Sequence, residues 1–153
     1  MQEPVIGSIF ALDQSQDDEV SSFRCADGHV DSSTVRTKVL VVDDEKLISD
    51  TLAEILANSG FDAIAAHDGW EALEVAARFR PDWLLSDVLM PRMNGVELAI
   101  AVRQRYPRTA VLLFSGQAGI SEILNDGHQR GYEFELIAKP IHPLKLIARL
   151  KAN

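Results

Sequence analysis

The sequence predicts a doubly wound α/β domain, built on a five-stranded parallel sheet with five helices. From residue 37 onward, short continuous apolar runs alternate five times with longer segments whose apolar residues recur at helical spacing. Strands separated by helices pair in parallel, and right-handed crossovers place the helices on both faces of one open sheet. Functional residues of such a sheet gather at the carboxyl ends of its strands, so these ends are where a site is expected.

The expected strands are short runs rich in Val, Leu, Ile and Ala, the composition of strands that are covered on both faces. They comprise residues 39–42, 61–66, 83–86, 110–114 and 136–138. The second run ends at the turn pair Asp68-Gly69, and the fourth is followed by a loop at Ser115-Gly116. Each run is short enough for a strand and too short for a helix.

The expected helices carry apolar stripes and end at residues that stop helices. The stripes span residues 47–56, 70–77, 98–106, 120–130 and 143–150. Pro81 and Pro107 end the second and third helices, because the residue before a proline disfavours helical backbone. Asn125 and Gly127 lie inside the fourth stripe and lower its helix propensity, so we expect a short or displaced helix there.

Composition and length exclude several classes of protein. The chain has 153 residues, of which 46% are hydrophobic, as in an ordinary globular domain. Its longest unbroken apolar runs have five residues, whereas a membrane-spanning helix needs about 20. Cys25 is the single cysteine, which excludes an internal disulfide and suits a reduced, cytoplasmic protein.

The negative charge is distributed unevenly along the chain. Of the net charge of −8, residues 1–36 carry −5 and the remaining residues carry −3. We therefore expect residues 1–36 to be an acidic, disordered N-terminal extension and residues 37–153 to form the folded domain. A net-negative chain is a poor binder of nucleic acid and of anionic membranes, so neither is an expected partner.

Polar residues follow four of the five expected strands. Asp43 and Asp44 follow the first strand, Asp87 the third, Ser115 the fourth and Lys139 the fifth. Three carboxylates at one edge of the sheet repel one another, and a divalent cation such as Mg²⁺ would relieve that repulsion. A lysine ammonium and a serine hydroxyl suit phosphoryl oxygens. Together these groups suggest phosphoryl transfer onto an aspartate.

This set of residues resembles that of the receiver domain of two-component response regulators. The resemblance covers residues 38 to about 151, and its matching positions are Asp43-Asp44, Asp87, Met90-Pro91, Gly95, Ser115-Gly116 and Lys139-Pro140. It implies a flavodoxin-like fold of the receiver type. It also implies a phospho-acceptor protein of a signal transduction system rather than an enzyme.

The resemblance implies a role for each acidic residue. Asp87 would take a phosphoryl group from a histidine kinase or a histidine phosphotransfer protein. Asp44, Asp87 and the backbone carbonyl of Leu89 would hold Mg²⁺, and Asp43 would reach the ion directly or through water.

Two further residues would read out the phosphorylated state. Lys139 would pair with the phosphoryl oxygens, and Ser115 would hydrogen-bond the phosphoryl group and draw its loop inward. The family often has an aromatic residue three positions before this lysine, where the present chain has Leu136. The chain therefore departs at this position from the pattern that is common in the family.

Two output routes are compatible with the sequence. Because the chain ends at Asn153, soon after the fifth helix, we expect a stand-alone regulator that controls a partner protein, with dimerisation on phosphorylation as one mode of contact. The alternative is an intermediate of a phosphorelay that passes the phosphoryl group to a second histidine protein.

Rival readings of the same fold fit the residues less well. A flavodoxin-type cofactor site needs a first loop that cradles phosphate, which Asp43-Asp44-Glu45 would repel. A phosphatase of the dehalogenase type needs a second aspartate two residues after its nucleophile. Glu45 and Lys46 occupy those positions here.

Overall fold

The computed structural model describes residues 35–116 and 119–152 of the chain. Residues 36–153 form one compact unit. Most of the predicted N-terminal extension, residues 1–34, lies outside the described residues. Among the helices described, none has both the length and the apolar character needed to cross a bilayer.

The sheet has five parallel strands in the order β3-β2-β4-β5-β6. Their bounds are β2 Lys38–Val42, β3 Asp62–Ala66, β4 Trp83–Asp87, β5 Ala110–Ser115 and β6 Glu135–Ala138. The strand order reverses between β2 and β4. The carboxyl ends of these two strands therefore flank the switch point of the sheet, where a ligand site is expected. The predicted fold class is confirmed.

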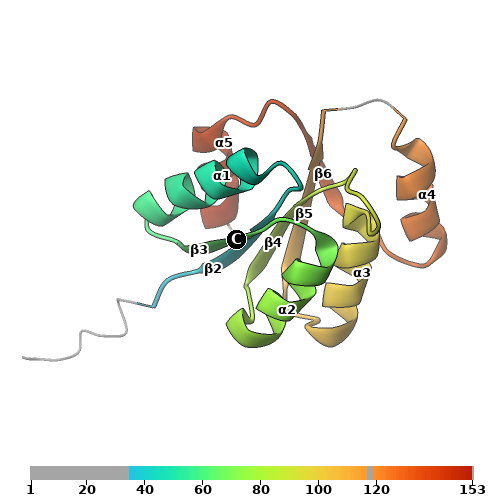
Figure 1. The fold of residues 1–153 in the computed structure, drawn as a ribbon, viewed down its shortest axis with the longest axis horizontal. Helices are drawn as coiled ribbons and strands as arrows, with labels where there is room; N and C mark the ends of the chain where they lie inside the picture. Colours follow the sequence, from blue (N-terminus) through green and yellow to red (C-terminus); the bar gives the residue numbers. More distant parts are fainter. Residues whose placement is uncertain (1–34, 117–118, 153) are drawn as a thin grey trace, which may run out of the picture. The chain divides into compact units, whose positions relative to one another are not determined.

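Helices cover both faces of this sheet (Figure 1). Their bounds are α1 Lys46–Asn58, α2 Gly69–Phe79, α3 Gly95–Arg105, α4 Ser121–Gln129 and α5 Pro143–Lys151. Apolar residues of α1 and α5 pack on one face, and those of α2 and α3 pack on the other. This arrangement follows from right-handed crossovers between parallel strands.

The core reflects the period of two in the strands. Along β2, Val39 and Val41 face the side covered by α1 and α5, whereas Leu40 and Val42 face α2 and α3. All four side chains are fully buried. A strand buried on both faces must be apolar at every position, which is why these runs are continuous in the sequence.

The fourth helix spans nine residues, as many as α5, and packs against α3 (Figure 1). Gly127 makes this approach possible, because a Cβ atom at this position would lie 2.7 Å from Cγ1 of Val96 on α3. The turn after α4 is closed by the amide of Tyr132, which donates to the carbonyl of Gly127 over 3.0 Å. The residue that weakens the helix in the sequence is thus the one that sets its position.

The strand β6 lies at the edge of the sheet and is incompletely covered. Leu136 pairs in register with the buried Leu113, so both point to the same face, yet Leu136 is 41% exposed. Tyr132 and Phe134 precede the strand and stack on each other with ring centroids 6.0 Å apart. The aromatic side chains near position 136 therefore lie in the loop before β6.

Candidate functional site

Three aspartates come together at the carboxyl edge of the sheet. Asp43 and Asp44 directly follow β2, and Asp87 is the last residue of β4, the neighbouring strand. One carboxylate oxygen from each lies within 4.8 Å of those of the other two. Among the described residues, this is the single cluster of acidic, histidine or cysteine side chains close enough to share a metal ion. The convergence follows from parallel pairing of β2 with β4.

Asp43 is held in place by three polar contacts. Its backbone amide donates to the carbonyl of Ala66, at the end of β3, over 3.3 Å. Its carboxylate accepts the amide hydrogen of Glu45 over 2.9 Å through Oδ1, while Oδ2 lies 3.0 Å from Nζ of Lys139. Asp43 is fully buried, and a buried carboxylate requires such partners.

Lys139 reaches into the cluster from the opposite side of the switch point. Its Nζ lies 3.0 Å from Asp43 and 3.4 Å from Asp87. The ammonium also lies 5.4 Å from the centre of the Phe114 ring, which favours a cation. The backbone amide of Lys139 donates to the carbonyl of Ser115 over 3.0 Å. A single lysine thus neutralises part of the charge of two carboxylates.

The charges of the cluster alter the protonation of its members. Burial raises the pKa of the Asp87 carboxyl above its usual value, and the nearby charges of Asp43 and Asp44 act in the same direction, against Lys139. Burial alone would lower the pKa of Lys139, but the hydrogen bond to Asp43 and the charges of both carboxylates outweigh it and raise that pKa. The cluster therefore carries more negative charge than Lys139 compensates.

Two other predicted residues lie beside the cluster. Ser115 ends β5 and is 7% exposed, and its carbonyl is joined to the amide of Lys139. Leu89 lies in the loop directly after β4, two residues beyond Asp87. The metal-binding role of its backbone carbonyl stays a prediction.

A glycine allows the backbone to pass close behind Asp87. Gly95, the first residue of α3, donates its amide hydrogen to the carbonyl of Val88 over 2.8 Å. A Cβ atom at Gly95 would lie 2.1 Å from the backbone oxygen of Asp87. Any larger residue would have to displace the backbone of the strand end that carries the aspartate.

The sequence analysis predicted that the polar residues after the strands lie close together. In the structure, Asp43, Asp44, Asp87 and Lys139 do so. The sequence analysis did not identify Phe114, whose ring lies near the Lys139 ammonium, or Ala66, whose carbonyl accepts the amide hydrogen of Asp43. Both are apolar residues within strands, so their composition signals burial and nothing more. Their position one residue before a strand-end polar group is the signal that could have indicated them.

Comparison with known proteins identifies the family. The family model described as the response regulator receiver domain matches residues 39–151, which is most of the chain. The chain is a response regulator receiver domain. Members of this family accept a phosphoryl group and bind Mg²⁺ at an acidic pocket, and the chain has a cluster of aspartates in the corresponding place.

Solved structures show the same receiver fold. The chemotaxis protein CheY4 of Vibrio cholerae is 31% identical, with a TM-score of 0.68 over 77% of this chain and 98% of that one. A two-component transcriptional regulator AraC from Clostridium phytofermentans ISDg is 34% identical, with a TM-score of 0.62 over 76% of the present chain and 90% of that one.

A third similar structure belongs to a much longer chain. NtrX from Brucella abortus, solved in complex with ATP, is 28% identical, with a TM-score of 0.66 over 77% of the present chain and 27% of that one. Receiver domains thus occur both as nearly the whole of a solved chain and as a small part of one.

Proposed function

We propose that Asp87 of this receiver accepts a phosphoryl group from a phosphohistidine in a two-component signalling system. The observation that carries the proposal is the position of Lys139, whose ammonium lies within 3.4 Å of Asp87 at the edge of an acidic cluster. A phosphoryl group on Asp87 would lie beside this cation. The other strand-end residues then have defined parts in the same reaction.

The chemistry requires one bond to form and one to break. A carboxylate oxygen of Asp87 forms a bond to phosphorus while the P–N bond of the phosphohistidine breaks, and the imidazole nitrogen keeps the electron pair of that bond. Lys139 stabilises the negative charge on the phosphoryl oxygens. Water later attacks phosphorus, which releases inorganic phosphate and restores the carboxylate.

The acidic cluster suits Mg²⁺. Its donors are carboxylate oxygens, which this cation prefers, and an open site with few protein ligands leaves room for water and a phosphoryl oxygen. Asp43, Asp44 and Asp87 would hold the ion, together with the backbone carbonyl of Leu89. When bound, Mg²⁺ neutralises charge on the carboxylates and on the transferring group. The raised pKa of Asp87 supports the need for such a cation.

Phosphorylation would be read out through the loops that follow β5 and β6. A phosphoryl group would supply new acceptor oxygens for the Ser115 hydroxyl and the Lys139 ammonium. The bond between the Lys139 amide and the Ser115 carbonyl joins these loops, so a shift of one would move the other. Leu136, at the half-exposed face of β6, stands where the family often has an aromatic residue.

The phosphoryl donor must be a protein that reaches this edge of the sheet. A groove of about 660 Å³ lies between α1 and the loop after β6, and it is lined mainly by apolar residues. Lys139 lines the groove and also contacts Asp87. Leu47, at its border, is 79% exposed. A helix of a histidine kinase or of a histidine phosphotransfer protein would fit this surface.

Two output routes fit this reaction. In the first, the protein acts in the cytoplasm as a stand-alone regulator and binds a target protein better when phosphorylated. In the second, it passes the phosphoryl group on to a second histidine protein in a phosphorelay. The apolar groove beside Asp87 serves either route, because the same surface can receive a donor or an acceptor histidine.

The proposal is tested by incubating the full chain with phosphoramidate, a small donor with a P–N bond, in the presence of Mg²⁺. We expect the intact mass to increase by one phosphoryl group, and chelation of Mg²⁺ to suppress the increase. Asp87→Asn should abolish it, whereas Asp82→Asn, at an exposed carboxylate before β4, should not. Labelling that survives Asp87→Asn would contradict the proposal.

The two output routes differ in what the phosphorylated protein does next. Dimerisation that appears only after phosphorylation, measured by sedimentation, would support signalling by contact. Transfer of the label to an added histidine phosphotransfer protein, with loss from Asp87, would support the relay.

A further inference from the structure

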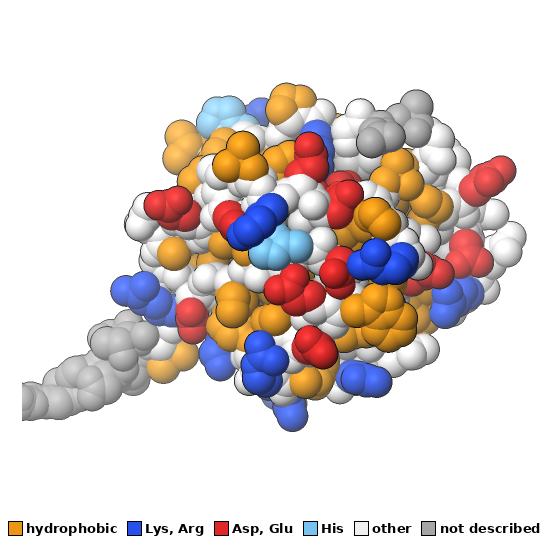
Figure 2. Space-filling model, in the orientation of Figure 1, with side chains coloured by type: hydrophobic (Ala, Val, Ile, Leu, Met, Phe, Trp, Pro, Cys, Tyr) orange, Lys and Arg blue, Asp and Glu red, His pale blue; other side chains and the backbone are white. Residues whose placement is uncertain are grey.

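A pocket with three arginines lies at the end of the sheet opposite the acidic cluster. It has a volume of about 430 Å³ and lies between the loop from α2 to β4 and the loop from α3 to β5. Figure 2 shows Lys and Arg side chains gathered along the lower border of the domain, where α2 and α3 end in Figure 1. We call this site the arginine pocket, because Arg80, Arg105 and Arg108 line it.

Hydrogen bonds between the two loops hold the pocket in shape. The hydroxyl of the buried Thr109 donates to the carbonyl of Pro81 over 2.8 Å. The amide of Ala110 donates to the carbonyl of Asp82 over 2.9 Å. Within the second loop, the amide of Thr109 donates to the carbonyl of Tyr106, also over 2.9 Å. The loops are therefore positioned before a ligand binds, so binding does not have to order them.

Arg80 is held with its guanidinium over an aromatic ring. Its backbone has φ 51° and ψ 66°, the left-handed conformation at which helices usually end on a glycine. Its Nε donates to the carbonyl of Ala77 over 3.2 Å, and its guanidinium carbon lies 5.1 Å from the centre of the Tyr106 ring. Within residues 35–116 and 119–152, neither Nη nitrogen of Arg80 has a hydrogen bond or an ion pair. Arg80 therefore presents unpaired donors in a fixed orientation.

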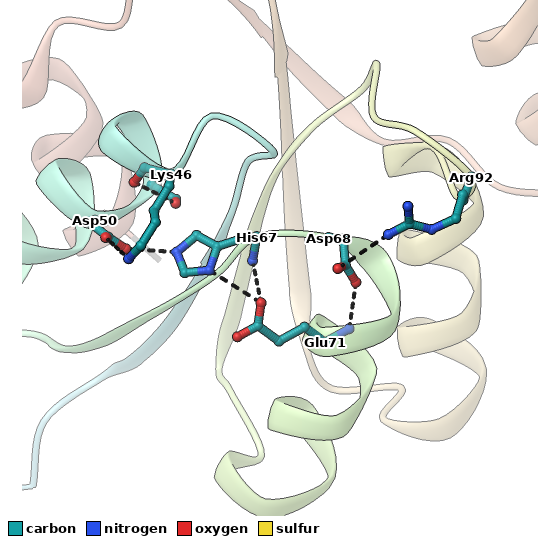
Figure 3. Close-up of polar contacts among 7 residues, drawn as sticks. Lys46, Asp50, His67, Asp68, Glu71 and Arg92 are labelled. Atoms are coloured by element: carbon teal, nitrogen blue, oxygen red, sulfur yellow. Dashed lines mark hydrogen bonds and ion pairs between the residues drawn. The ribbon is translucent and has the colours of Figure 1, made fainter.

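The other two arginines of the pocket have no partner in the described part of the chain. There, the side chains of Arg105 and Arg108 form neither an ion pair nor a hydrogen bond. By contrast, Arg92, in the loop after β4, lies 3.4 Å from the carboxylate of Asp68, as Figure 3 shows. The positive charge of the arginine pocket is thus not paired within the described residues.

One carboxylate lies in the lining of the pocket. Asp82 accepts the amide hydrogen of Lys38 over 2.8 Å through Oδ2, and among the described residues it forms no ion pair with an arginine. Three arginines and one aspartate leave the lining with a formal charge of +2. The pocket is therefore suited to an anion with at least two negative charges.

The helix ends at the pocket do not prevent an anion from binding. Unpaired carbonyls at the C-terminus of a helix repel negative charge. At the end of α2, the amide of Arg80 donates to the carbonyl of Ala76 over 2.9 Å, and Nζ of Lys38 donates to the carbonyl of Phe79 over 3.3 Å. Since the protein itself satisfies these carbonyls, the guanidinium groups dominate the electrostatics of the pocket.

We propose that the arginine pocket binds a small anion with two or more linked phosphoryl groups, such as pyrophosphate or the phosphates of a nucleotide. A guanidinium group matches phosphoryl oxygens with two parallel hydrogen bonds. A diphosphate brings several charges into one compact group, which can pair with more than one arginine. The volume of the pocket lies within the usual range of small-molecule sites, about 300–1,000 Å³. The proposal is independent of phosphorylation at Asp87, which lies at the other end of β4.

The proposal is tested by isothermal titration calorimetry of the full chain with sodium pyrophosphate, with EDTA present to remove divalent cations. We expect saturable binding of one pyrophosphate per chain. Arg105→Gln and Arg108→Gln should each raise the dissociation constant about five- to tenfold, because a hydrogen bond to a charged group is worth about tenfold or more in affinity and solvent exposure weakens it. Asp82→Asn should lower the dissociation constant, because it removes a negative charge from the lining.

Arg130→Gln is the matched control for the change in charge. It removes one positive charge at the end of α4, where Arg130 pairs with Asp126, and should leave the dissociation constant unchanged. Titration with ADP separates two sources of the ligand: tighter binding than that of pyrophosphate supports a nucleotide, and weaker binding supports an inorganic diphosphate. No saturable binding of either anion would overturn the proposal. Binding that Arg105→Gln and Arg108→Gln weaken no more than Arg130→Gln does would also overturn it.

Discussion

At the scale of single residues, Lys139 pairs with two carboxylates in the resting protein and has a second role in the proposed phosphorylated state. Its ammonium compensates Asp43 and Asp87 in the protein without metal, and the same group would bind phosphoryl oxygens after transfer. The buried Asp43 has Lys139 as its ion-pair partner among the described residues. In the proposed function, the lysine would therefore affect both the stability of the resting protein and its response to phosphorylation.

We predict that Lys139→Ala lowers the free energy of unfolding by about 1–3 kcal/mol without Mg²⁺, the usual cost of leaving a buried polar group without its partner. Added Mg²⁺ should recover more stability in this variant than in the wild type, because the carboxylates would repel one another more strongly. Urea unfolding with and without Mg²⁺ measures both effects. Lys145→Ala, at an exposed position on α5, is the matched control. A variant that Mg²⁺ stabilises no more than the wild type would contradict this account.

Asp87 lowers the stability of the folded protein at neutral pH, whereas Lys139 raises it. Burial first, and then the charge of Asp43, raise its pKa above the ordinary value of 3.8. A carboxyl with a raised pKa favours the folded state when it is protonated, and this stability is lost as pH rises through the raised pKa. Ionised Asp87 therefore destabilises the metal-free protein at neutral pH.

We predict that Asp87→Asn is more stable than the wild type at pH 7 in the absence of Mg²⁺, although it cannot be phosphorylated. The gain should shrink as the pH falls through the raised pKa toward the ordinary value of 3.8, and it should vanish below 3.8, where the wild-type carboxyl is protonated in both states. Denaturant unfolding at neutral and acidic pH measures the difference. If the variant were less stable than the wild type at pH 7, the ionised carboxylate would not destabilise the folded protein, and the prediction would be wrong.

Sequence reasoning identified the polar residues of the site because the rule that it used concerns strand ends. Asp43, Asp87 and Lys139 are each within one residue of a strand end, and parallel pairing is sufficient to bring such positions together. The rule could not predict that Lys139 lies closer to Asp43 than to Asp87, because that depends on side-chain rotamers. It also had no means of placing Arg80 in one pocket with Arg105 and Arg108.

At the scale of elements, the start of α3 positions Asp87, the proposed phospho-acceptor. Asn94 and Glu97 form a capping box, in which each side chain accepts the backbone amide hydrogen of the other residue. This cap fixes the first turn of α3, and Gly95 in that turn lies against the backbone of Asp87. The helix start and the strand end are therefore built as one unit.

We predict that Gly95→Ala lowers the free energy of unfolding by about 1–3 kcal/mol, the usual cost of overpacking, and slows phosphorylation of Asp87. The added Cβ would lie 2.1 Å from the Asp87 carbonyl oxygen, so strand, helix or both must move. Unfolding and labelling with phosphoramidate measure the two effects. Gly60→Ala is a control for the loss of glycine, since its Cβ would contact nothing within 4 Å, although its positive φ adds strain. If Gly95→Ala were labelled as fast as the wild type, the start of α3 would not be needed to position Asp87.

The elements differ in how well the sequence predicts them. The strands were predicted to within a residue or two at each end because continuous apolar runs are distinctive. The fourth helix was predicted to be short or displaced. Its position against α3 depends on the close approach of Gly127 to Val96. Such a contact joins residues far apart in sequence, and periodicity within one helix carries no information about it.

At the scale of the whole molecule, the topology explains why one domain can hold the complete site. Two strands next to the switch point supply the carboxylates, and the following two supply Ser115 and Lys139. The groove that includes Lys139 opens beside them. In the proposed function, a phosphoryl donor, Mg²⁺ and the loops that hold Ser115 and Lys139 would therefore meet at one edge of the sheet. The two apolar cores lie between the helices and the sheet.

The central claim is that Asp87 carries the phosphoryl group, and reductive trapping tests it most directly. An aspartyl phosphate is an acyl phosphate, which borohydride reduces to an alcohol, so the modified aspartate becomes homoserine. After phosphorylation with Mg²⁺, borohydride treatment and proteolysis, peptide mass mapping should find homoserine at position 87, and the sample without phosphodonor should contain none. Homoserine at Asp43 or Asp44 instead, or at no aspartate of the chain, would contradict the account.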